Sequence, residues 1–351
     1  MIIELNGLPG CGKTTLKNVA CSKSVGVAEF RGEGRPFFYK LVLKLRRFIG
    51  QFTPANIGLY KDVRNNVNGE LHIIIVDNCS PNDSFEALVK KYQSENRVSV
   101  IKNQSNDGYA KGINFGYDYA KVKEPYIMFA DQDDVWLSDK IQKTYAVMKK
   151  TEKSGIPIAV HTDLRVVDSE LQTISPSYYT LENREPRAND LKQLLTKNTA
   201  AGCTMMINRP LVDLGLQHSV LMKKTLHDWG YMLLARLYGE IVFINEPTIL
   251  YRQHEDNSVG AKDKKGFRYK AEQCLELFKG KKMKYIKNSV QLEKDLVKEI
   301  NMFLEKDNQY YEYICQYQKV QKEGKLRRMM FYYKTNATCH SVLKVWRVLF
   351  V

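Results

Sequence analysis

Eight residues near the start of the chain have the spacing of a phosphate-binding loop. Residues 7–14 read G-x-x-x-x-G-K-T, a pattern whose backbone N–H groups surround phosphate oxygens. The candidate phosphate contacts are Gly12, Lys13 and Thr14, with Lys13 reaching the terminal phosphates and Thr14 holding Mg²⁺. The apolar segment MIIEL precedes the loop and a helical pattern follows it. The loop therefore raises the question of nucleotide hydrolysis or phosphoryl transfer.

Nucleotide turnover needs more than this loop. It also needs a second group that holds Mg²⁺ and a positioned nucleophile, on a sheet of several parallel strands. Between residues 17 and 70 no apolar strand-like run ends in Asp, and the segment is too short for a complete doubly wound domain. We therefore expect residues 1–66 to form an incomplete P-loop-like segment that binds phosphate weakly.

A cluster of carboxylates follows the apolar run at 126–130. Asp131, Asp133 and Asp134 lie within four residues, and like charges this close repel one another. A hard divalent cation, Mg²⁺ or Mn²⁺, relieves that repulsion and bridges to substrate phosphates. The alternative is a helix N-cap, which would explain Asp134 or Asp139 but not three carboxylates together. The cluster predicts a metal site.

Strand and helix patterns alternate through this part of the chain. Apolar runs at 72–76, 97–101 and 126–130 are each followed by a polar loop and a helical pattern. Such alternation predicts an α/β fold with a parallel sheet, in which ligands bind beyond the carboxyl ends of the strands. Asp77 and the carboxylate cluster both lie there.

Five segments resemble family-2 glycosyltransferases in order and approximate spacing. They are IIIVDNCSPNDS, NDGYAKGINFG, YIMFADQDDVW, HDWGYMLLA and YRQHEDNSVGA, and they span about residues 70–265. The resemblance is to bacterial rhamnosyltransferase-like members. It implies the α/β GT-A fold, a Rossmann-like nucleotide-diphosphosugar transferase domain, here with a helical C-terminal extension at 266–351.

The resemblance also implies roles for the donor-side residues. Asp77 would contact the nucleobase, Lys111 would lie near the nucleotide, and Asp131 would approach the ribose or the sugar. Asp133 would bind the metal beneath the diphosphate, and His254 would be a further metal or diphosphate contact. A lone histidine on the surface is the alternative for His254.

By the same resemblance Asp228 would be the general base. Glycosyl transfer from a nucleotide donor needs one carboxylate to take the proton of the acceptor hydroxyl, while the metal stabilises the departing diphosphate. Asp228 is expected to precede the helix WGYMLLARLYG, so a capping role is the alternative. Residues 198–208, NTAAGCTMMIN, resemble the segment that floors the acceptor site.

One feature of the family is missing from the front of the chain. Family-2 glycosyltransferases open with a strand whose loop packs on the nucleobase, and here the P-loop-like segment stands in its place. Either MIIEL occupies the vacant strand position, or residues 1–66 are the front of an unrelated kinase joined to a truncated transferase. In both cases part of the nucleotide pocket is absent or rebuilt.

The charge of the chain indicates anionic partners. The 351 residues carry a net charge of +15, and from residue 262 onward 21 Lys and Arg stand against 10 Asp and Glu. Residues 324–351 mix basic with large apolar side chains, which favours lying on an anionic membrane surface, or a basic helical cap on the transferase domain. No nucleic-acid-binding module is visible, so nucleic acid is not an expected partner.

Cysteine usage and hydropathy suggest a compartment. The seven cysteines are widely spaced and form no C-x-x-C pair, which favours reduced thiols in the cytoplasm. No signal-peptide pattern and no spanning run of 18 apolar residues occurs. We expect a cytoplasmic protein that is peripheral at the inner face of the cell membrane.

The sequence therefore predicts a metal-dependent glycosyltransferase. It would move rhamnose or a similar sugar from a nucleotide-diphosphate donor to a lipid-linked or cell-surface glycan. The alternative is a P-loop nucleotide-binding protein, or a catalytically impaired hybrid of a kinase fragment and a truncated transferase.

Overall fold

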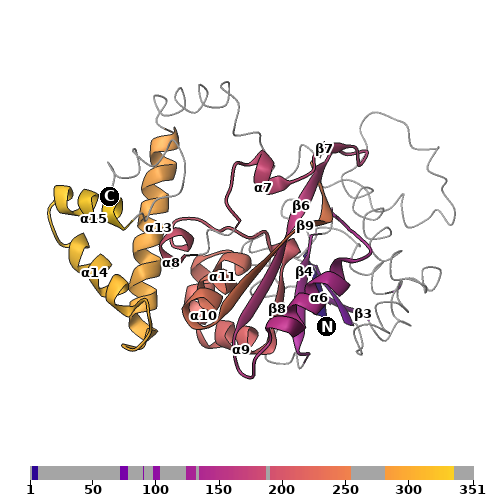
Figure 1. The fold of residues 1–351 in the computed structure, drawn as a ribbon, viewed down its shortest axis with the longest axis horizontal. Coiled ribbons are helices and arrows are strands. Elements are labelled where there is room, and N and C mark those ends of the chain that lie inside the picture. The colour runs from indigo at the N-terminus through magenta and orange to yellow at the C-terminus, as the bar shows by residue number, and fades with distance from the viewer. Residues whose placement is uncertain are drawn as a thin grey trace.

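The computed structural model describes most of the chain from residue 124 onward and a few strands before it. The described residues are 2–6, 72–77, 90, 98–102, 124–131, 134–186, 190–253 and 281–335. Figure 1 shows them as a coloured ribbon, with a sheet at the centre and a group of long helices at one end.

A mixed sheet of nine described strands forms the centre of the molecule. The strands are β1 (Ile2–Asn6), β2 (His72–Asp77), β3 (Val98–Lys102), β4 (Tyr126–Ala130), β5 (Val135–Trp136), β6 (Ile158–Val167), β7 (Thr173–Ser175), β8 (Met206–Asn208) and β9 (Glu240–Arg252). They follow the order β3-β2-β1-β4-β8-β6-β9-β5, and β7 pairs with β6 outside this path. The first four in this order run parallel, and β8 is antiparallel to both of its neighbours.

The N-terminal segment MIIEL belongs to this sheet. Strand β1 lies between β2 and β4 and is parallel to both, with Leu5 opposite Ala130 and Asn6 opposite Val76. Of the two predicted possibilities for this segment, occupation of the vacant strand position is confirmed. The loop that follows β1 lies outside the described residues.

The helices cover the sheet and then extend beyond it. They are α6 (Lys140–Thr151), α7 (Tyr178–Leu181), α8 (Leu191–Leu194), the 3₁₀ helix η4 (Gly202–Thr204), α9 (Arg209–Gln217), α10 (Ser219–Lys224), α11 (His227–Tyr238), α13 (Lys281–Phe303), α14 (Tyr311–Gln321) and α15 (Lys325–Lys334). Several begin at capping side chains. For example, the Asn208 side chain accepts from the Leu211 N–H at the start of α9.

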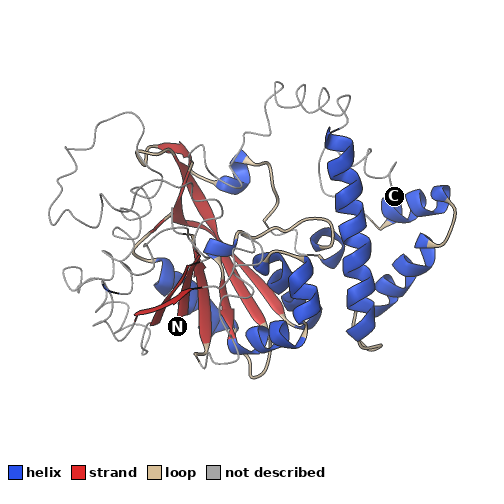
Figure 2. Cartoon of the chain, turned by 180° about the vertical axis from the view of Figure 1, so that it is seen from behind, coloured by secondary structure: helices blue, strands red, loops and turns tan. Residues whose placement is uncertain are grey.

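The C-terminal helices share one hydrophobic core with the helices that cover the sheet. Buried side chains of α13, such as Leu296 and Ile300, belong to the same cluster as Leu233 of α11. The Asn308 side chain donates to the Leu237 carbonyl at 2.7 Å, which closes the carboxyl end of α11. Figure 2 shows α13, α14 and α15 standing beyond the sheet at one end of the molecule. The predicted helical extension is confirmed for these residues.

Hydropathy along these helices is moderate. In the parts of the chain that the structure describes, no helix combines the length and apolar character needed to cross a bilayer.

Candidate active site

Two predicted site residues lie at the carboxyl ends of parallel strands, which together form one edge of the sheet. Asp77 is the last residue of β2, and Asp131 directly follows β4. Because β1 alone separates these strands, the two backbones lie about 10 Å apart, which is two strand spacings. Both residues lie at the carboxyl ends of their strands, as the strand pattern predicted. Their roles in donor binding stay predictions.

Six of the predicted site residues lie outside the described part of the chain. They are Gly12, Lys13, Thr14, Lys111, Asp133 and His254. Their roles stay predictions.

The sequence led us to expect Asp228 just before a helix, but the residue lies inside that helix. Helix α11 begins at His227 with Leu226 at the N-cap, so Asp228 falls in the first turn. The apolar pattern starts at Trp229 and misplaced the boundary, because His227 and Asp228 are polar residues buried at the helix N-terminus. The N-cap position is occupied by Leu226, whose side chain makes no capping hydrogen bond, so Asp228 is not the N-cap residue.

Two backbone N–H groups hold the Asp228 carboxylate. Oδ2 accepts from the Gly202 N–H at 3.1 Å, and Oδ1 accepts from the Trp229 N–H at 2.7 Å. The side chain of Asn198 adds a third hydrogen bond. These contacts fix the orientation of a carboxylate that is only 8% exposed.

Burial changes the acidity of Asp228. Loss of solvation raises its pKa to about 6, although the hydrogen bonds from Trp229, Gly202 and Asn198 act in the opposite direction. A carboxylate with this pKa is ionised at neutral pH and is more basic than an ordinary aspartate. Asp228 therefore has the properties of a general base that works near neutrality.

His227 connects the start of α11 to strand β4. Its buried ring lies 4.5 Å from the ring of Phe129, and Phe129 precedes Asp131 by two residues. Burial lowers the pKa of His227 to about 3, so the imidazole is neutral. The ring also packs on Gly202, where an added Cβ would lie 2.5 Å from Nε2. The helix that carries Asp228 is thus packed directly against the strand that leads to Asp131.

A second group of polar side chains lies beside Asp131. One ligand atom each from Asp131, Asp134 and Cys203 fall within 4.8 Å of one another. Burial and the two neighbouring carboxylates raise the pKa of the Cys203 thiol well above its ordinary value, so the thiol is neutral. Sequence reasoning missed Cys203, because nothing in the sequence signals that residue 203 returns to the strand end at residue 130.

The donor set at this cluster suits a hard divalent cation. Asp131 and Asp134 supply carboxylate oxygens, which Mg²⁺ and Mn²⁺ prefer. Asp134 also has a structural contact, since its Oδ1 accepts from the Arg252 N–H of β9 at 3.2 Å. The half-buried Asp131 is therefore the more accessible described ligand. Asp139, the other residue considered as a cap, occupies the N-cap of α6 without a side-chain hydrogen bond there.

The sequence also misjudged the segment after the carboxylates. The helix expected after the polar loop begins only at Lys140, because the short strand β5 comes first and pairs with β9. Lys140 is fully buried beneath the cluster, with its ammonium 4.6 Å from the Trp136 ring. Burial lowers its pKa to about 7, and the neighbouring Cys203 and Asp134 oppose that shift.

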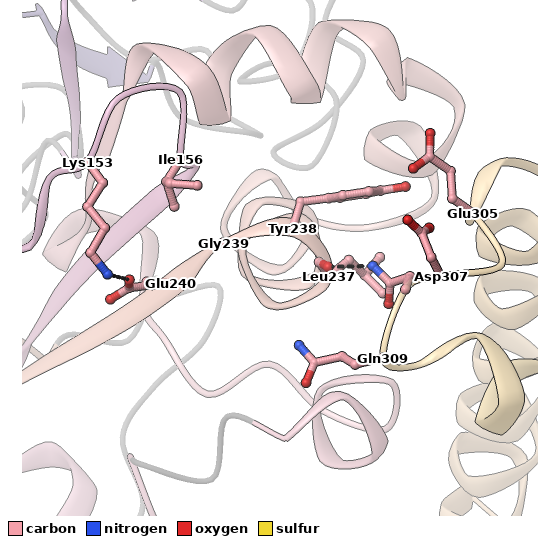
Figure 3. Close-up of a pocket in the computed structure, with 10 residues that line it drawn as sticks. Lys153, Ile156, Leu237, Tyr238, Gly239, Glu240, Glu305, Asp307 and Gln309 are labelled. Carbon is pink, nitrogen blue, oxygen red and sulfur yellow. Dashed lines mark hydrogen bonds and ion pairs between the residues drawn. The ribbon is translucent and has the colours of Figure 1, made fainter.

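A cavity of about 450 Å³ lies at the other edge of the sheet, where β9 begins (Figure 3). Glu240, Glu305 and Asp307 contribute carboxylates to its lining, and Lys153 is paired with Glu240 at 3.0 Å. This lining repels a diphosphate. The cavity is therefore unsuited to a nucleotide-sugar donor, unlike the edge with Asp77 and Asp131.

Comparison with known proteins agrees with this geometry. The family described as Glycosyl transferase family 2 matches residues 58–215. The match includes Asp77, Asp131, Asp134 and Gly202. It begins at residue 58, near the end of the predicted segment 1–66 and well after the loop at 7–14, for which it gives no support.

Two bacterial proteins are similar to the chain over part of their length. The dTDP-rhamnosyl transferase RfbG of Shigella flexneri is 27% identical over 207 residues, covering 55% of this chain and 66% of RfbG. The putative teichuronic acid biosynthesis glycosyltransferase TuaG of Bacillus subtilis is 32% identical over 76 residues, covering 22% of this chain and 29% of TuaG. The chain thus spans just under two thirds of RfbG and less than a third of TuaG.

Among solved structures, TarS of S. aureus in complex with UDP-GlcNAc aligns with a TM-score of 0.44 and 13% identity, over 96% of this chain and 87% of that one. The family match together with the mixed α/β sheet and the C-terminal helices confirms the predicted GT-A fold. The family and its relatives support the glycosyltransferase class and do not favour the P-loop alternative.

Proposed function

We propose that this chain transfers a sugar from a nucleotide-diphosphate donor to a hydroxyl group of a glycan or lipid-linked glycan, with Asp228 as the general base. The observation that carries the proposal is the state of the Asp228 carboxylate. It is buried, held by two backbone N–H groups, and has a pKa raised to about 6. A carboxylate in this state accepts the proton of an attacking hydroxyl at neutral pH.

The donor would bind at the carboxyl edge of the sheet. Asp77 and Asp131 border this edge, and we assign the nucleobase to Asp77 and the ribose or sugar to Asp131. Lys111 would approach the nucleotide. The residues 198–208 would floor the acceptor site, which agrees with the contacts of Asn198 and Gly202 to Asp228.

The carboxylates at this edge would hold Mg²⁺ or Mn²⁺. Asp131 and the predicted ligands Asp133 and His254 are the proposed set, with Asp134 close to Asp131. A bound cation would neutralise charge that develops on the departing diphosphate, so the reaction needs no general acid.

The sugar and its acceptor are inferred from chemistry and similarity. The resemblance to RfbG, which is described as a dTDP-rhamnosyl transferase, favours rhamnose or a similar sugar. The acceptor would be a growing cell-surface polysaccharide. The basic C-terminal region would hold the protein peripherally on the inner membrane face, in the cytoplasm.

A thermal-shift screen of nucleotide sugars tests the proposal. dTDP-rhamnose, UDP-sugars and GDP-sugars would each be added with and without Mn²⁺, and one of them is expected to raise the melting temperature more strongly with the cation. Transfer to a lipid-linked glycan would then be followed with the stabilising donor. ATP or GTP that stabilises the chain and is hydrolysed, with no response to any nucleotide sugar, would contradict the proposal.

A further inference from the structure

Helix α15 is anchored firmly on one side. Tyr332 is fully buried and its hydroxyl is hydrogen-bonded to that of Tyr317 on α14. The Phe331 ring lies 5.7 Å from the Tyr313 ring and 5.9 Å from the Tyr317 ring. Because these side chains belong to the hydrophobic core, the orientation of α15 on the molecule is fixed.

The opposite side of α15 presents large apolar side chains to solvent. Leu326 is 75% exposed, Met330 is 54% exposed and Tyr333 is 75% exposed. Their spacing of four and then three residues puts them on one face of the helix. An exposed stripe of this kind is unusual on a helix whose other side is already buried in a core, so it calls for a partner.

Basic side chains flank this stripe. Lys325, Arg327 and Lys334 are exposed, and the helix contains no acidic residue between its ends. Arg327 lies 3.6 Å from Glu323, in the turn before the helix, and remains 75% exposed in this pair. The outer face of α15, defined by Leu326, Met330 and Tyr333 with these three basic residues, therefore combines apolar contact with positive charge.

We propose that the outer face of α15 is a docking surface for an anionic lipid bilayer. The three apolar side chains would enter the boundary between headgroups and acyl chains, while the basic residues would contact lipid phosphates. Long basic side chains suit this position, because their stems lie along apolar surface and their charges stay in water. A second copy of the chain fits poorly, since two such faces would oppose like charges.

The inference rests on the membrane contact included in the proposed function, and it assigns that contact to one helix. It requires nothing of the donor, the acceptor or Asp228. Membrane binding can therefore be measured without any sugar-transfer assay, and failure of either proposal is separable from failure of the other.

Vesicle co-sedimentation of the full chain tests this assignment. Neutral phosphatidylcholine vesicles would be compared with vesicles that also contain phosphatidylglycerol, at low salt. Two variants probe α15: Leu326→Ser/Met330→Ser/Tyr333→Ser for the stripe and Arg327→Gln/Lys334→Gln for the charge. The wild type is expected to sediment with anionic vesicles, and removal of the two charges should lower its partition coefficient roughly 25-fold, about fivefold for each.

Matched controls carry the same changes elsewhere on the surface. Ile174→Ser/Leu216→Ser/Val220→Ser removes three exposed apolar side chains, and Lys150→Gln/Lys306→Gln removes two exposed charges. Both controls should bind anionic vesicles like the wild type, and melting curves of every variant would confirm folding. If both α15 variants sediment with anionic vesicles as strongly as the wild type does, the assignment to α15 would be overturned. No sedimentation of the wild type would overturn membrane docking altogether, while donor binding would remain to be judged by the thermal-shift screen.

Discussion

The backbone N–H of Gly202 donates a 3.1 Å hydrogen bond to the carboxylate of Asp228. The next residue, Cys203, places its Sγ within 4.8 Å of carboxylate oxygens of Asp131 and Asp134. One turn of 3₁₀ helix therefore connects the candidate base to the candidate metal ligands. A change in this turn should act on both halves of the site.

Replacement of Asp228 tests its role as the base. Asp228→Asn keeps the shape of the side chain and removes the proton acceptor, so the rate of transfer should fall roughly 10²–10⁴-fold. Donor binding should persist, because Asp228 is assigned to the acceptor hydroxyl. Steady-state rates and donor titrations would measure the two effects separately.

A matched control for this variant is Asp213→Asn. Asp213 lies on α9, where it is paired with Arg209 at the surface. This substitution makes the same chemical change away from the site and should leave the rate within about twofold, since surface ion pairs contribute little. Near-normal turnover in Asp228→Asn would refute the assignment of the base.

The raised pKa of Asp228 predicts how activity depends on pH. The base works only when it is ionised, so kcat/KM should fall about tenfold per pH unit below pH 6. The profile should be flat above that value until another group titrates. A profile with no inflection between about pH 5 and 7 would argue against Asp228.

The same pKa predicts a linked change in stability. The folded state binds the Asp228 proton up to about pH 6, whereas the unfolded state releases it near the ordinary value of 3.8. The folded state therefore holds more protons between these values, and the contribution of Asp228 to stability falls as pH rises through them. At 1.36 kcal/mol per pKa unit the total is about 3 kcal/mol. Denaturant unfolding of the wild type and Asp228→Asn between about pH 4 and 7 should show their difference in unfolding free energy changing by most of this amount, in favour of the variant as pH rises.

Gly202 is expected to tolerate no side chain. An added Cβ would lie 2.5 Å from Nε2 and 2.8 Å from Cε1 of the buried His227 ring. Gly202→Ala should therefore lower the free energy of unfolding by about 1–3 kcal/mol, as overpacking does. It should also reduce activity beyond the loss of folded protein, because it displaces the N–H that holds Asp228.

Gly324→Ala is the control for this substitution, because a Cβ at residue 324 meets no atom within 4 Å. Chemical denaturation and transfer rates of the two variants should differ clearly. Equal stability and activity in both variants would show that the His227 ring can move aside for a Cβ at residue 202, which would contradict the prediction.

Much of the sheet could be predicted from the sequence, because its strands are short apolar runs that end in polar residues. The run at 126–130 coincides with β4, and the runs at 72–76 and 97–101 lie within one residue of β2 and β3. Strand β6 (Ile158–Val167) was missed. Its sequence IAVHTDLRVV includes buried His161 and Asp163, which interrupt the apolar pattern that would have revealed it.

The candidate site was only partly predictable. Asp228 and Asp131 lie in segments that resemble known motifs. The groups that contact them, however, are set by how the chain between them folds. Gly202 and Cys203 were predicted only as part of residues 198–208, the segment expected to floor the acceptor site. Their contacts depend on β8 returning antiparallel beside β4, a long-range pairing that no local pattern contains.

Metal dependence provides a further prediction. Asp131→Ala and Asp133→Ala should each remove the Mn²⁺-dependent part of nucleotide-sugar binding, because each deletes a carboxylate ligand. Calorimetric titration with and without Mn²⁺ would measure this loss. Asp168→Ala, which removes a carboxylate that closes an exposed turn, is the comparison. Unchanged Mn²⁺-dependent affinity in both site variants would exclude a metal at this edge.

The final prediction concerns the P-loop-like segment after β1. Strand β1 lies between β2 and β4 and runs parallel to both, so its last residue, Asn6, lies at the same edge of the sheet as Asp77 and Asp131. We therefore predict that Lys13, which follows β1 in the sequence, would serve the diphosphate of the nucleotide sugar in place of ATP. Lys13→Ala should weaken donor binding in calorimetric titrations, and the wild type should show no robust ATPase or GTPase activity, because hydrolysis requires Mg²⁺ held from a second side and a positioned water. Strong wild-type hydrolysis that disappears in Lys13→Ala would instead make the chain a nucleotide hydrolase with a transferase-like sheet.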